Sequence, residues 1–304
     1  MSGDGPPADE WLQVTADGGA AEARLWWRSV PTLPGERAGI VGGFRATSET
    51  AARAVLARAA AALRAQGCTC AIGPMDGSTW RSYRFVTEPG TAPPFLLEPA
   101  HPPEWPRWWE AAGFAPLARY YSTLTPDLVA RDQRTERAGA RLRAAGVTIR
   151  TVDLARFDAE LAAVHAVALA AFADNFLYTP LPPAEFVAQY QAARAHLRRE
   201  FLLLAEQAGR PVGFVFALPD LLQAQRGEPV STVIVKTLAV RPGREYAGLG
   251  AVLLAEVHAA ARRLGFRQAI HAMMHARNVS RNLSARYART IRGYALYARA
   301  LENP

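Results

Sequence analysis

Apolar residues alternate between strand-like and helix-like spacing along the whole chain. In the first part, Ser48 stands where a helix N-cap is expected, Glu49 follows in the first turn, and Gly67 ends the apolar period. The remaining elements expected there are a tryptophan-rich helix at 105–113 and strands at 22–30, 39–44, 68–72 and 115–124. This order predicts a mixed α/β fold.

The second part repeats the alternation. A nearly continuous apolar run over 231–240 predicts a buried strand. We expect a polar connecting helix at 127–145, further helices at 158–173, 183–199 and 250–264, a hairpin formed by 201–206 and 211–218, and a strand at 267–274.

A weak internal repeat relates the two parts. A shift of 198 residues places Arg64 on Arg262, Gly67 on Gly265 and Ile72 on Ile270. Each part then reads strand, helix, glycine, strand, which favours two related domains. We therefore expect a flexible tail at 1–10, an N-terminal domain at 11–126, a linker helix within 127–148 and a C-terminal domain at 149–304.

Charge and cysteine content narrow the classes of function. The chain of 304 residues carries a net charge of +8, with 34 arginines and one lysine, Lys236. Nine of these arginines lie between Arg262 and Arg299, where no acidic residue occurs, so this stretch should attract anions. Cys68 and Cys70 have no neighbouring His/Cys cluster, so we expect no metal site. A polar N-terminus and the absence of a long apolar run predict a cytoplasmic protein without a membrane span.

The segment over 238–251 carries the clearest chemical signal. A predicted buried strand ends at Val240, glycines follow at 243, 248 and 250, and a helix begins at the last of them. The first amides of a helix have no internal partner and attract phosphate together with the helix dipole. Arg241 and Arg244 add positive charge. The alternative is an ordinary strand-to-helix turn that contains glycines.

This segment resembles the acyl-CoA-binding motif of the GNAT superfamily. Leu238, Val240, Pro242, Gly248 and Gly250 match the motif, over a resemblance that extends across 230–282 and more loosely across 150–230. Glu245 departs from the motif, where glutamine or arginine is usual. The resemblance implies a phosphopantetheine thioester, from acyl-CoA or an acyl-carrier protein, held by Leu238, Ala239, Val240, Arg241, Arg244, Tyr246, Ala247, Gly248, Leu249, Gly250, Ala251, Asn278 and Arg281. It also implies two GNAT-like domains, each a mixed and mostly antiparallel sheet flanked by helices.

The N-terminal domain resembles a degenerate copy of this unit. Under the same shift, Thr50 and Ala52 stand in place of Gly248 and Gly250, so no donor site is expected there.

The GNAT reaction implies a base, an oxyanion site and an acid for the leaving thiol. His271 and His275 share one face of a predicted strand and are candidates for the base, or they are packed histidines. Lys236 either pairs with a carboxylate such as Asp220, polarises the acyl group, or reaches solvent. Candidate acids are Tyr287 and Tyr294, with Tyr297, although the last two also fit helical core packing.

Two loops are candidates for the acceptor site. The resemblance places Asn175, Phe176 and Tyr178 where an acceptor is commonly bound. In the first part, the polar and aromatic segment from Asp76 to Trp80, with Arg81 and Arg84, faces the acceptor or is a plain surface turn.

These observations together predict an N-acyltransferase that acylates an amine of a small molecule by direct attack, as in bacterial secondary metabolism. An acidic carrier protein would dock on the arginine-rich stretch 262–299. The alternatives are an aminoacyl-tRNA-dependent transferase and a non-catalytic binding protein of the same fold. No RNA-binding motif is present, which argues against nucleic acid.

Overall fold

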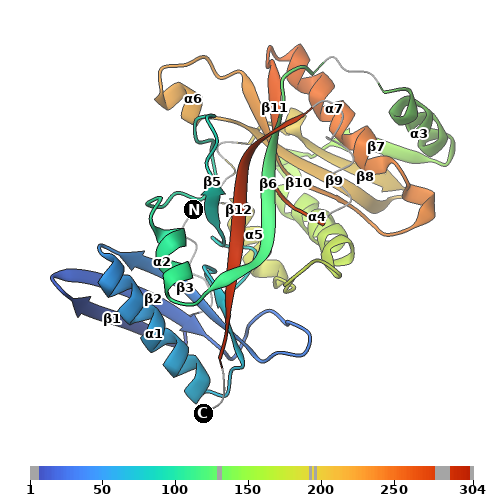
Figure 1. The fold of residues 1–304 in the computed structure, drawn as a ribbon. Coiled ribbons are helices and arrows are strands. Elements are labelled where there is room, and N and C mark those ends of the chain that lie inside the picture. The colour runs from blue at the N-terminus through green and yellow to red at the C-terminus, as the bar shows by residue number, and fades with distance from the viewer. Residues whose placement is uncertain (1–6, 129–131, 192–193, 195–196, 278–287, 302–304) are drawn as a thin grey trace.

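The computed structural model describes residues 7–128, 132–191, 194, 197–277 and 288–301, and these form one α/β body (Figure 1). Its helices are α1 (Glu49–Ala65), α2 (Trp105–Ala111), α3 (Gln133–Ala144), α4 (Phe157–Phe172), α5 (Pro183–Gln191), α6 (Leu222–Gln225) and α7 (Leu249–Arg263). The strands are β1 (Glu10–Ala16), β2 (Gly19–Trp26), β3 (Ala38–Ala46), β4 (Cys70–Gly73), β5 (Phe85–Glu88), β6 (Ala115–Thr125), β7 (Val147–Thr151), β8 (Leu202–Gln207), β9 (Arg210–Pro219), β10 (Thr232–Val240), β11 (Gln268–His275) and β12 (Arg289–Ala300).

The described strands form one 12-stranded sheet in the order β1-β2-β3-β4-β12-β6-β11-β10-β9-β8-β7, with β5 beside β12. The strand pairs among the described residues are antiparallel except β3 with β4 and β10 with β11. Each parallel pair is joined through a helix, α1 in one case and α7 in the other. The repeat expected from the sequence is therefore present as two strand–helix–strand units.

The two halves of the chain exchange their last strands. β6 ends the first half but lies between β12 and β11, while β12 ends the second half and lies between β4 and β6. Tyr297 and Leu301 consequently join the N-terminal core cluster, which also contains Leu56 and Trp109. Because of this exchange, a cut near residue 126 would separate strands that pair with each other. Whether 11–126 and 149–304 fold as separate domains stays a prediction.

The helix expected as a linker has a larger role. α3 begins after Asp132, whose carboxylate caps the amide of Arg134, and it packs along α7. Leu142 is 2% exposed and belongs to the same core cluster as Val252 of α7. α3 is thus a layer of the C-terminal half.

The structure corrects the expected elements at several points. Glu10 begins β1 and the Asp9 carboxylate accepts a hydrogen bond from the Trp27 amide (2.7 Å), so the prediction of a tail up to residue 10 is wrong for these two residues. α5 ends at Gln191, not near residue 199. Tyr294 and Tyr297 lie on strand β12, so the helical interpretation of their spacing is wrong. β1, β5, β7 and β12 were not expected.

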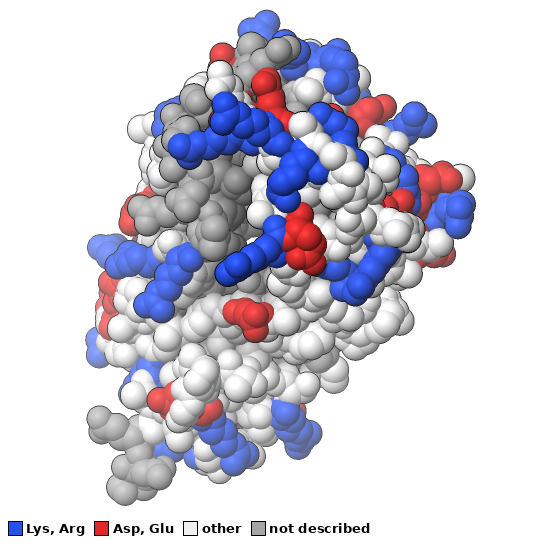
Figure 2. Space-filling model, turned by 90° about the vertical axis from the view of Figure 1, so that its right-hand side faces the viewer, with Lys and Arg blue, Asp and Glu red and all other residues white. Residues whose placement is uncertain are grey.

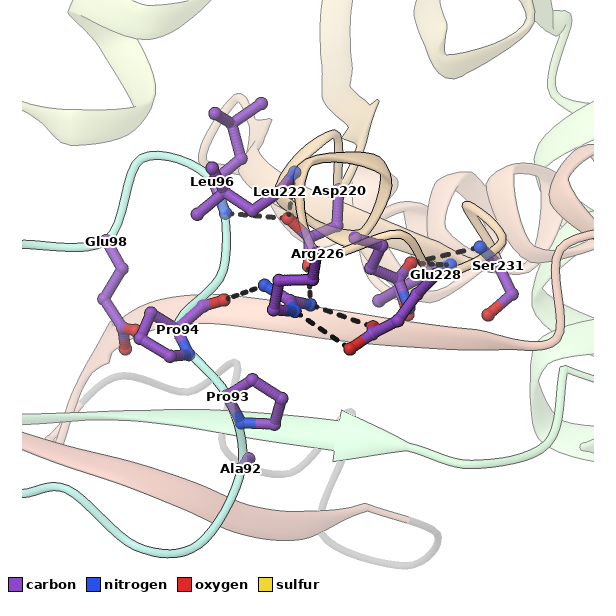
Figure 3. A network of polar contacts seen from close by, with 12 residues as sticks. Ala92, Pro93, Pro94, Leu96, Glu98, Asp220, Leu222, Arg226, Glu228 and Ser231 are labelled. Carbon is purple, nitrogen blue, oxygen red and sulfur yellow. Dashed lines mark hydrogen bonds and ion pairs between the residues drawn. The ribbon is translucent and has the colours of Figure 1, made fainter.

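A network of polar contacts ties the loop after β5 to the C-terminal half (Figure 3). The Asp220 carboxylate accepts from the Leu96 amide (2.9 Å), and Arg226 donates to the Pro94 carbonyl (2.9 Å) and pairs with Glu228. Burial raises the pKa of Asp220. The expected pairing of Lys236 with Asp220 is therefore wrong, since Arg226 is the cation that Asp220 meets, at 3.9 Å.

A second, buried network lies beside the first. Arg292 is 5% exposed and pairs with Glu98 at 2.8 Å. The Tyr294 hydroxyl donates to the same carboxylate at 2.6 Å and lies 3.0 Å from the Ser122 hydroxyl.

Within the described residues, no helix is long and apolar enough to cross a bilayer.

Candidate active site

A large cleft lies between the two halves of the chain. Its volume is about 2360 Å³, above the roughly 300–1,000 Å³ of a typical small-molecule site. It is lined by β10, β11, the start of α7 and β6, which pairs with β11, and by the 76–84 segment of the first half. The cleft is therefore larger than a site for one small molecule requires.

The cleft opens where two neighbouring strands part. β10 and β11 pair in parallel only from Thr232–Gln268 to Val235–His271. Directly after these pairs, Lys236 forms an irregularity against β9, and Ala272 and Met273 form one against β6, with Met273 at φ 55°. Bulges of this kind bend a strand and end its pairing. The edges of β10 and β11 that face each other there are left open to the cleft.

The start of α7 presents free amides to this opening. Gly248 is the N-cap residue, with φ 84° and no side-chain cap, whereas Ser48 caps the matching helix α1 through the Ala51 amide (3.2 Å). Among the described residues, the amides of Leu249, Gly250 and Ala251 have no hydrogen-bond acceptor. Gly248, Gly250 and Ala251 line the cleft. The helix start is therefore built like an anion site.

α3 holds the loop before α7, residues 241–248, which we call the glycine loop. Arg141 donates to the Glu245 carbonyl at 3.2 Å and to the Ala247 carbonyl. A Cβ atom on Gly248 would lie 2.8 Å from the Ala138 Cβ, so only glycine allows this approach. The glycine loop is thereby fixed by α3, which is not part of the cleft lining.

The residues expected to hold the donor divide into two groups. Those that line the cleft are Leu238, Val240, Tyr246, Gly248, Gly250 and Ala251. The others are absent from its lining. Ala239 and Leu249 are buried, and Arg244 and Ala247 are exposed. Arg241 donates instead to the carbonyls of Pro211 (2.8 Å) and Ala166 (3.2 Å). Asn278 and Arg281 lie outside the described residues.

Glu245, the departure from the expected motif, is turned aside. Its carboxylate lies over Gly243, 2.6 Å from where a Cβ on that glycine would be, and is not part of the cleft lining. The two glycines nearest the helix start thus face the cleft without this acidic neighbour.

Lys236 is the basic group at the parting of the strands. It lines the cleft, is partly buried, and has no carboxylate or hydrogen-bond partner in the described part of the chain. Burial, together with the charge of Arg84, lowers the pKa of Lys236 to about 7. An amine with such a pKa exchanges protons readily at neutral pH.

The two predicted histidines have different surroundings. His271 is 6% exposed and its ring stacks on His258, with the two Nε2 atoms 3.3 Å apart. Burial, aided by His258, lowers the pKa of His271 to about 3, so its ring is a weak base. His275 lies beside the rings of Tyr120 and Phe176, and burial and the nearby Arg277 and Arg84 lower its pKa as well.

Two of the tyrosines expected as acids, Tyr294 and Tyr297, are described by the structure, and both hydroxyls donate to carboxylates. Tyr294 is 1% exposed, and burial and the Glu98 carboxylate raise its pKa. The Tyr297 hydroxyl donates to Glu110 at 3.0 Å, and burial raises its pKa too. Tyr287 lies outside the described residues.

The acceptor candidates from the two halves of the chain line the same cleft. Asn175, Phe176, Tyr178, Asp76 and Trp80 all belong to its lining. The Trp80 indole donates to the Thr179 carbonyl at 2.8 Å and packs against Tyr178, with ring centroids 6.0 Å apart. The Asp76 carboxylate accepts from the Gly43 amide at 2.6 Å, and burial raises its pKa. Segments almost 100 residues apart therefore form one wall.

Arg84 has a larger place in the cleft than the sequence predicted, where it was named only beside the candidate acceptor segment 76–80. It is 6% exposed, and its guanidinium lies between the rings of Tyr83 and Tyr120, at 3.6 and 4.1 Å from their centroids. Nη1 donates to the Met273 carbonyl at 3.1 Å. The neighbouring Tyr83 was the only local signal, because Tyr120 and Met273 arrive from distant strands.

The arginine-rich stretch does not form one surface. Arg292 is buried against Glu98, and Arg299 donates to the Ala112 carbonyl at the far end of β12 (2.9 Å). Figure 2 views the side where α3 and α7 lie in Figure 1, and there basic side chains gather in the upper half with acidic ones among them. The described arginines of the stretch 262–299 therefore do not share one face, and docking of a carrier protein there stays a prediction. Residues 7–128, 132–191, 194, 197–277 and 288–301 contain no group of three or more potential metal ligands.

Comparison with known proteins places the fold. No protein family model matches the sequence. A segment of 214 residues is 28% identical to a protein of Caulobacter vibrioides (strain NA1000 / CB15N) named bacterial ceramide synthase, covering 68% of this chain and 54% of that protein. The chain thus spans about half the length of this relative.

Solved structures align over nearly the whole chain. A GCN5-related N-acetyltransferase from Sphaerobacter thermophilus aligns with 97% of this chain and 81% of its own, at a TM-score of 0.54 and 16% identity. A tandem GNAT protein from the clavulanic acid biosynthesis pathway aligns with 99% of this chain and 86% of its own, at a TM-score of 0.52 and 14% identity. The chain has the mixed α/β GNAT fold, with a large and mostly antiparallel sheet.

Proposed function

We propose that this protein is an N-acyltransferase that moves an acyl group from a phosphopantetheine thioester to an amine. One observation carries the proposal: the uncapped start of α7 faces a cleft beside the point where β10 and β11 part. Free helix amides suit a diphosphate, and an open strand edge suits the amide-rich pantetheine arm.

The donor would lie along β10. The amides of Leu249 to Ala251 would bind its diphosphate, and the strand from Val240 back to Lys236 would run beside the pantetheine. The thioester would then reach the part of the cleft that Lys236 and Met273 line. Backbone amides on the open strand would stabilise the oxyanion that forms on the thioester carbonyl.

Lys236 would accept the proton of the attacking amine. It lines the cleft at the strand opening and has a pKa near neutrality, which suits a general base. Asn175, Phe176, Tyr178, Asp76 and Trp80 would form the acceptor wall. In the balanced step, the amine nitrogen bonds to the acyl carbon, the carbon–sulfur bond breaks, and the thiol leaves.

The ceramide synthase relative supports amide formation, because a ceramide is an N-acylated lipid. The aromatic part of the cleft lining would accommodate a long apolar chain on either substrate: Trp26, Trp80, Phe172, Phe176, Tyr178, Tyr190 and Phe216. Acyl-CoA is the proposed donor. A carrier-protein donor and transfer from aminoacyl-tRNA are the competing interpretations.

Ligand-induced stabilisation distinguishes these donors. We expect CoA at about 100 times its Kd to stabilise the fold by about 2.7 kcal/mol, seen as a higher melting temperature. The measurement is a thermal-shift series with CoA, a holo acyl-carrier protein and tRNA. Stabilisation by the carrier protein alone would favour the tethered donor. Stabilisation by tRNA with a steep salt dependence would favour the RNA interpretation. No stabilisation by any of them would contradict an enzyme that uses these donors.

A further inference from the structure

A buried cation stands in the cleft without an anionic partner. Arg84 is 6% exposed and lines the cleft, yet no carboxylate pairs with it in the described part of the chain. Its Nε donates to the Tyr83 carbonyl (3.2 Å) and its Nη1 to the Met273 carbonyl (3.1 Å), while Nη2 has no hydrogen-bond partner among the described residues. The Nη2 group of Arg84 can therefore donate hydrogen bonds to a ligand.

No described carboxylate of the cleft lining pairs with Arg84: Asp174 and Glu185 are exposed, and the other three have other partners. Glu98 pairs with Arg292 at 2.8 Å, Glu22 with Arg45 at 3.4 Å, and Asp76 accepts from the Gly43 amide. Tyr83 and Tyr120 compensate part of the cost of burying Arg84 through their ring faces. A buried charge that the protein leaves without a counter-ion is a feature of binding sites more than of cores.

We propose that Arg84 binds a carboxylate of the acceptor, so that the substrate class is an amine that also carries a carboxylate, such as an amino acid. This inference rests on the proposed function. Arg84 and Lys236 line one cleft and interact electrostatically, so a small molecule can meet both. The carboxylate would be held by Arg84 while the amine faces Lys236 and the thioester.

The position of Arg84 separates this anion site from that of the donor. Arg84 donates to Met273 on β11, whereas the expected diphosphate site is at the start of α7, beyond the end of β10. Guanidinium groups bind carboxylates well because their donors are planar and permanently charged. The ligand of Arg84 is therefore assigned to the acceptor.

The experiment compares each of the twenty standard amino acids with its own primary amide as acceptor. Free thiol released from acetyl-CoA and from palmitoyl-CoA is measured for the wild type and for Arg84→Met, Arg84→Lys and the surface control Arg28→Met. Arg28 pairs with Asp9 and its side chain is 78% exposed. The amide keeps the amine and side chain but lacks the charge. Its amine is also less basic, so without carboxylate recognition the amide should react faster.

We expect at least one amino acid to exceed its amide by roughly 100-fold in kcat/KM, which corresponds to about 2.7 kcal/mol of binding to Arg84. Arg84→Met should reduce this preference to within about threefold, Arg84→Lys should retain part of it, and Arg28→Met should keep all of it. CoA affinity should stay within about threefold in every variant. This last readout shows that the donor site is still formed.

Three results would overturn the inference. The first is failure of every carboxylate-bearing amine to release thiol, whether or not other amines do. The second is an acid/amide ratio that Arg84→Met leaves unchanged. The third is a loss of CoA affinity of about tenfold or more in Arg84→Met, which would assign the anion to the donor. Absence of CoA binding to the wild type would instead contradict the proposed function.

Discussion

Gly250→Glu is expected to abolish acyl transfer while the protein stays folded. Gly250 lies in the first turn of α7 and lines the cleft, so the new carboxylate would project beside the proposed diphosphate. Two charges about 4 Å apart interact by about 4 kcal/mol near a protein surface, so CoA affinity should fall roughly 100- to 1,000-fold. The fold should tolerate the change, because a carboxylate in the first turn of a helix is favourable to the helix dipole.

The matched control is Ala255→Glu. Ala255 is an exposed residue of the same helix and is not part of the cleft lining, so this variant adds the same charge away from the site. CoA titration and the melting temperature of both variants are the measurements. Equal CoA affinity in Gly250→Glu and wild type would contradict the donor site. Gly248 is less suitable for this test, because its φ of 84° and its contact with Ala138 make any side chain disrupt the local fold.

Lys236 is expected to set the pH dependence of transfer. Only the neutral amine accepts a proton, so kcat should rise with pH to a plateau, with a midpoint near the Lys236 pKa of about 7. Lys236→Met should remove the midpoint and lower kcat by roughly 10²- to 10⁴-fold. Arg84→Met should move the midpoint to higher pH, since the charge of Arg84 contributes to lowering the pKa. Steady-state rates between pH 5.5 and about 9 provide the measurement.

Unfolding gives an independent check of the same pKa. The pKa of Lys236 falls from 10.5 in the unfolded chain to about 7 in the fold, so the unfolded state binds more protons between these values. Stability should therefore rise with pH in this window, by up to about 1.4 kcal/mol per pH unit, in wild type relative to Lys236→Met. If His275→Gln removed the pH midpoint of kcat and Lys236→Met retained it, His275 and not Lys236 would be the base.

The strand–loop–helix unit over 232–263 could be predicted from sequence because its signal is local. A buried strand, a glycine-containing loop and an amphipathic helix occupy consecutive residues, and the structure places β10, the glycine loop and α7 in that order. The helix cap of α1 was predictable for the same reason, since Ser48 and the Ala51 amide are three residues apart. In each case, propensity and tertiary structure agree.

The rest of the site depends on pairing between distant segments. β12 was missed because Tyr294 and Tyr297 are three residues apart, which fits a helix, while its flanking positions carry small and charged residues. The exchange of β6 and β12 brings Arg84 to Met273, a separation of 189 residues along the chain. A local pattern contains no information about such contacts, so the surroundings of Arg84 and Lys236 required the structure.

In the proposed donor site, helix amides around residues 249–251 bind the diphosphate of the donor. The most direct measurement is a calorimetric titration of the wild-type protein with CoA and with pantetheine, which lacks the diphosphate. We expect CoA to bind at least about 100-fold more tightly, a difference of about 2.7 kcal/mol. Equal affinity for the two compounds, or binding of neither, would contradict this donor site.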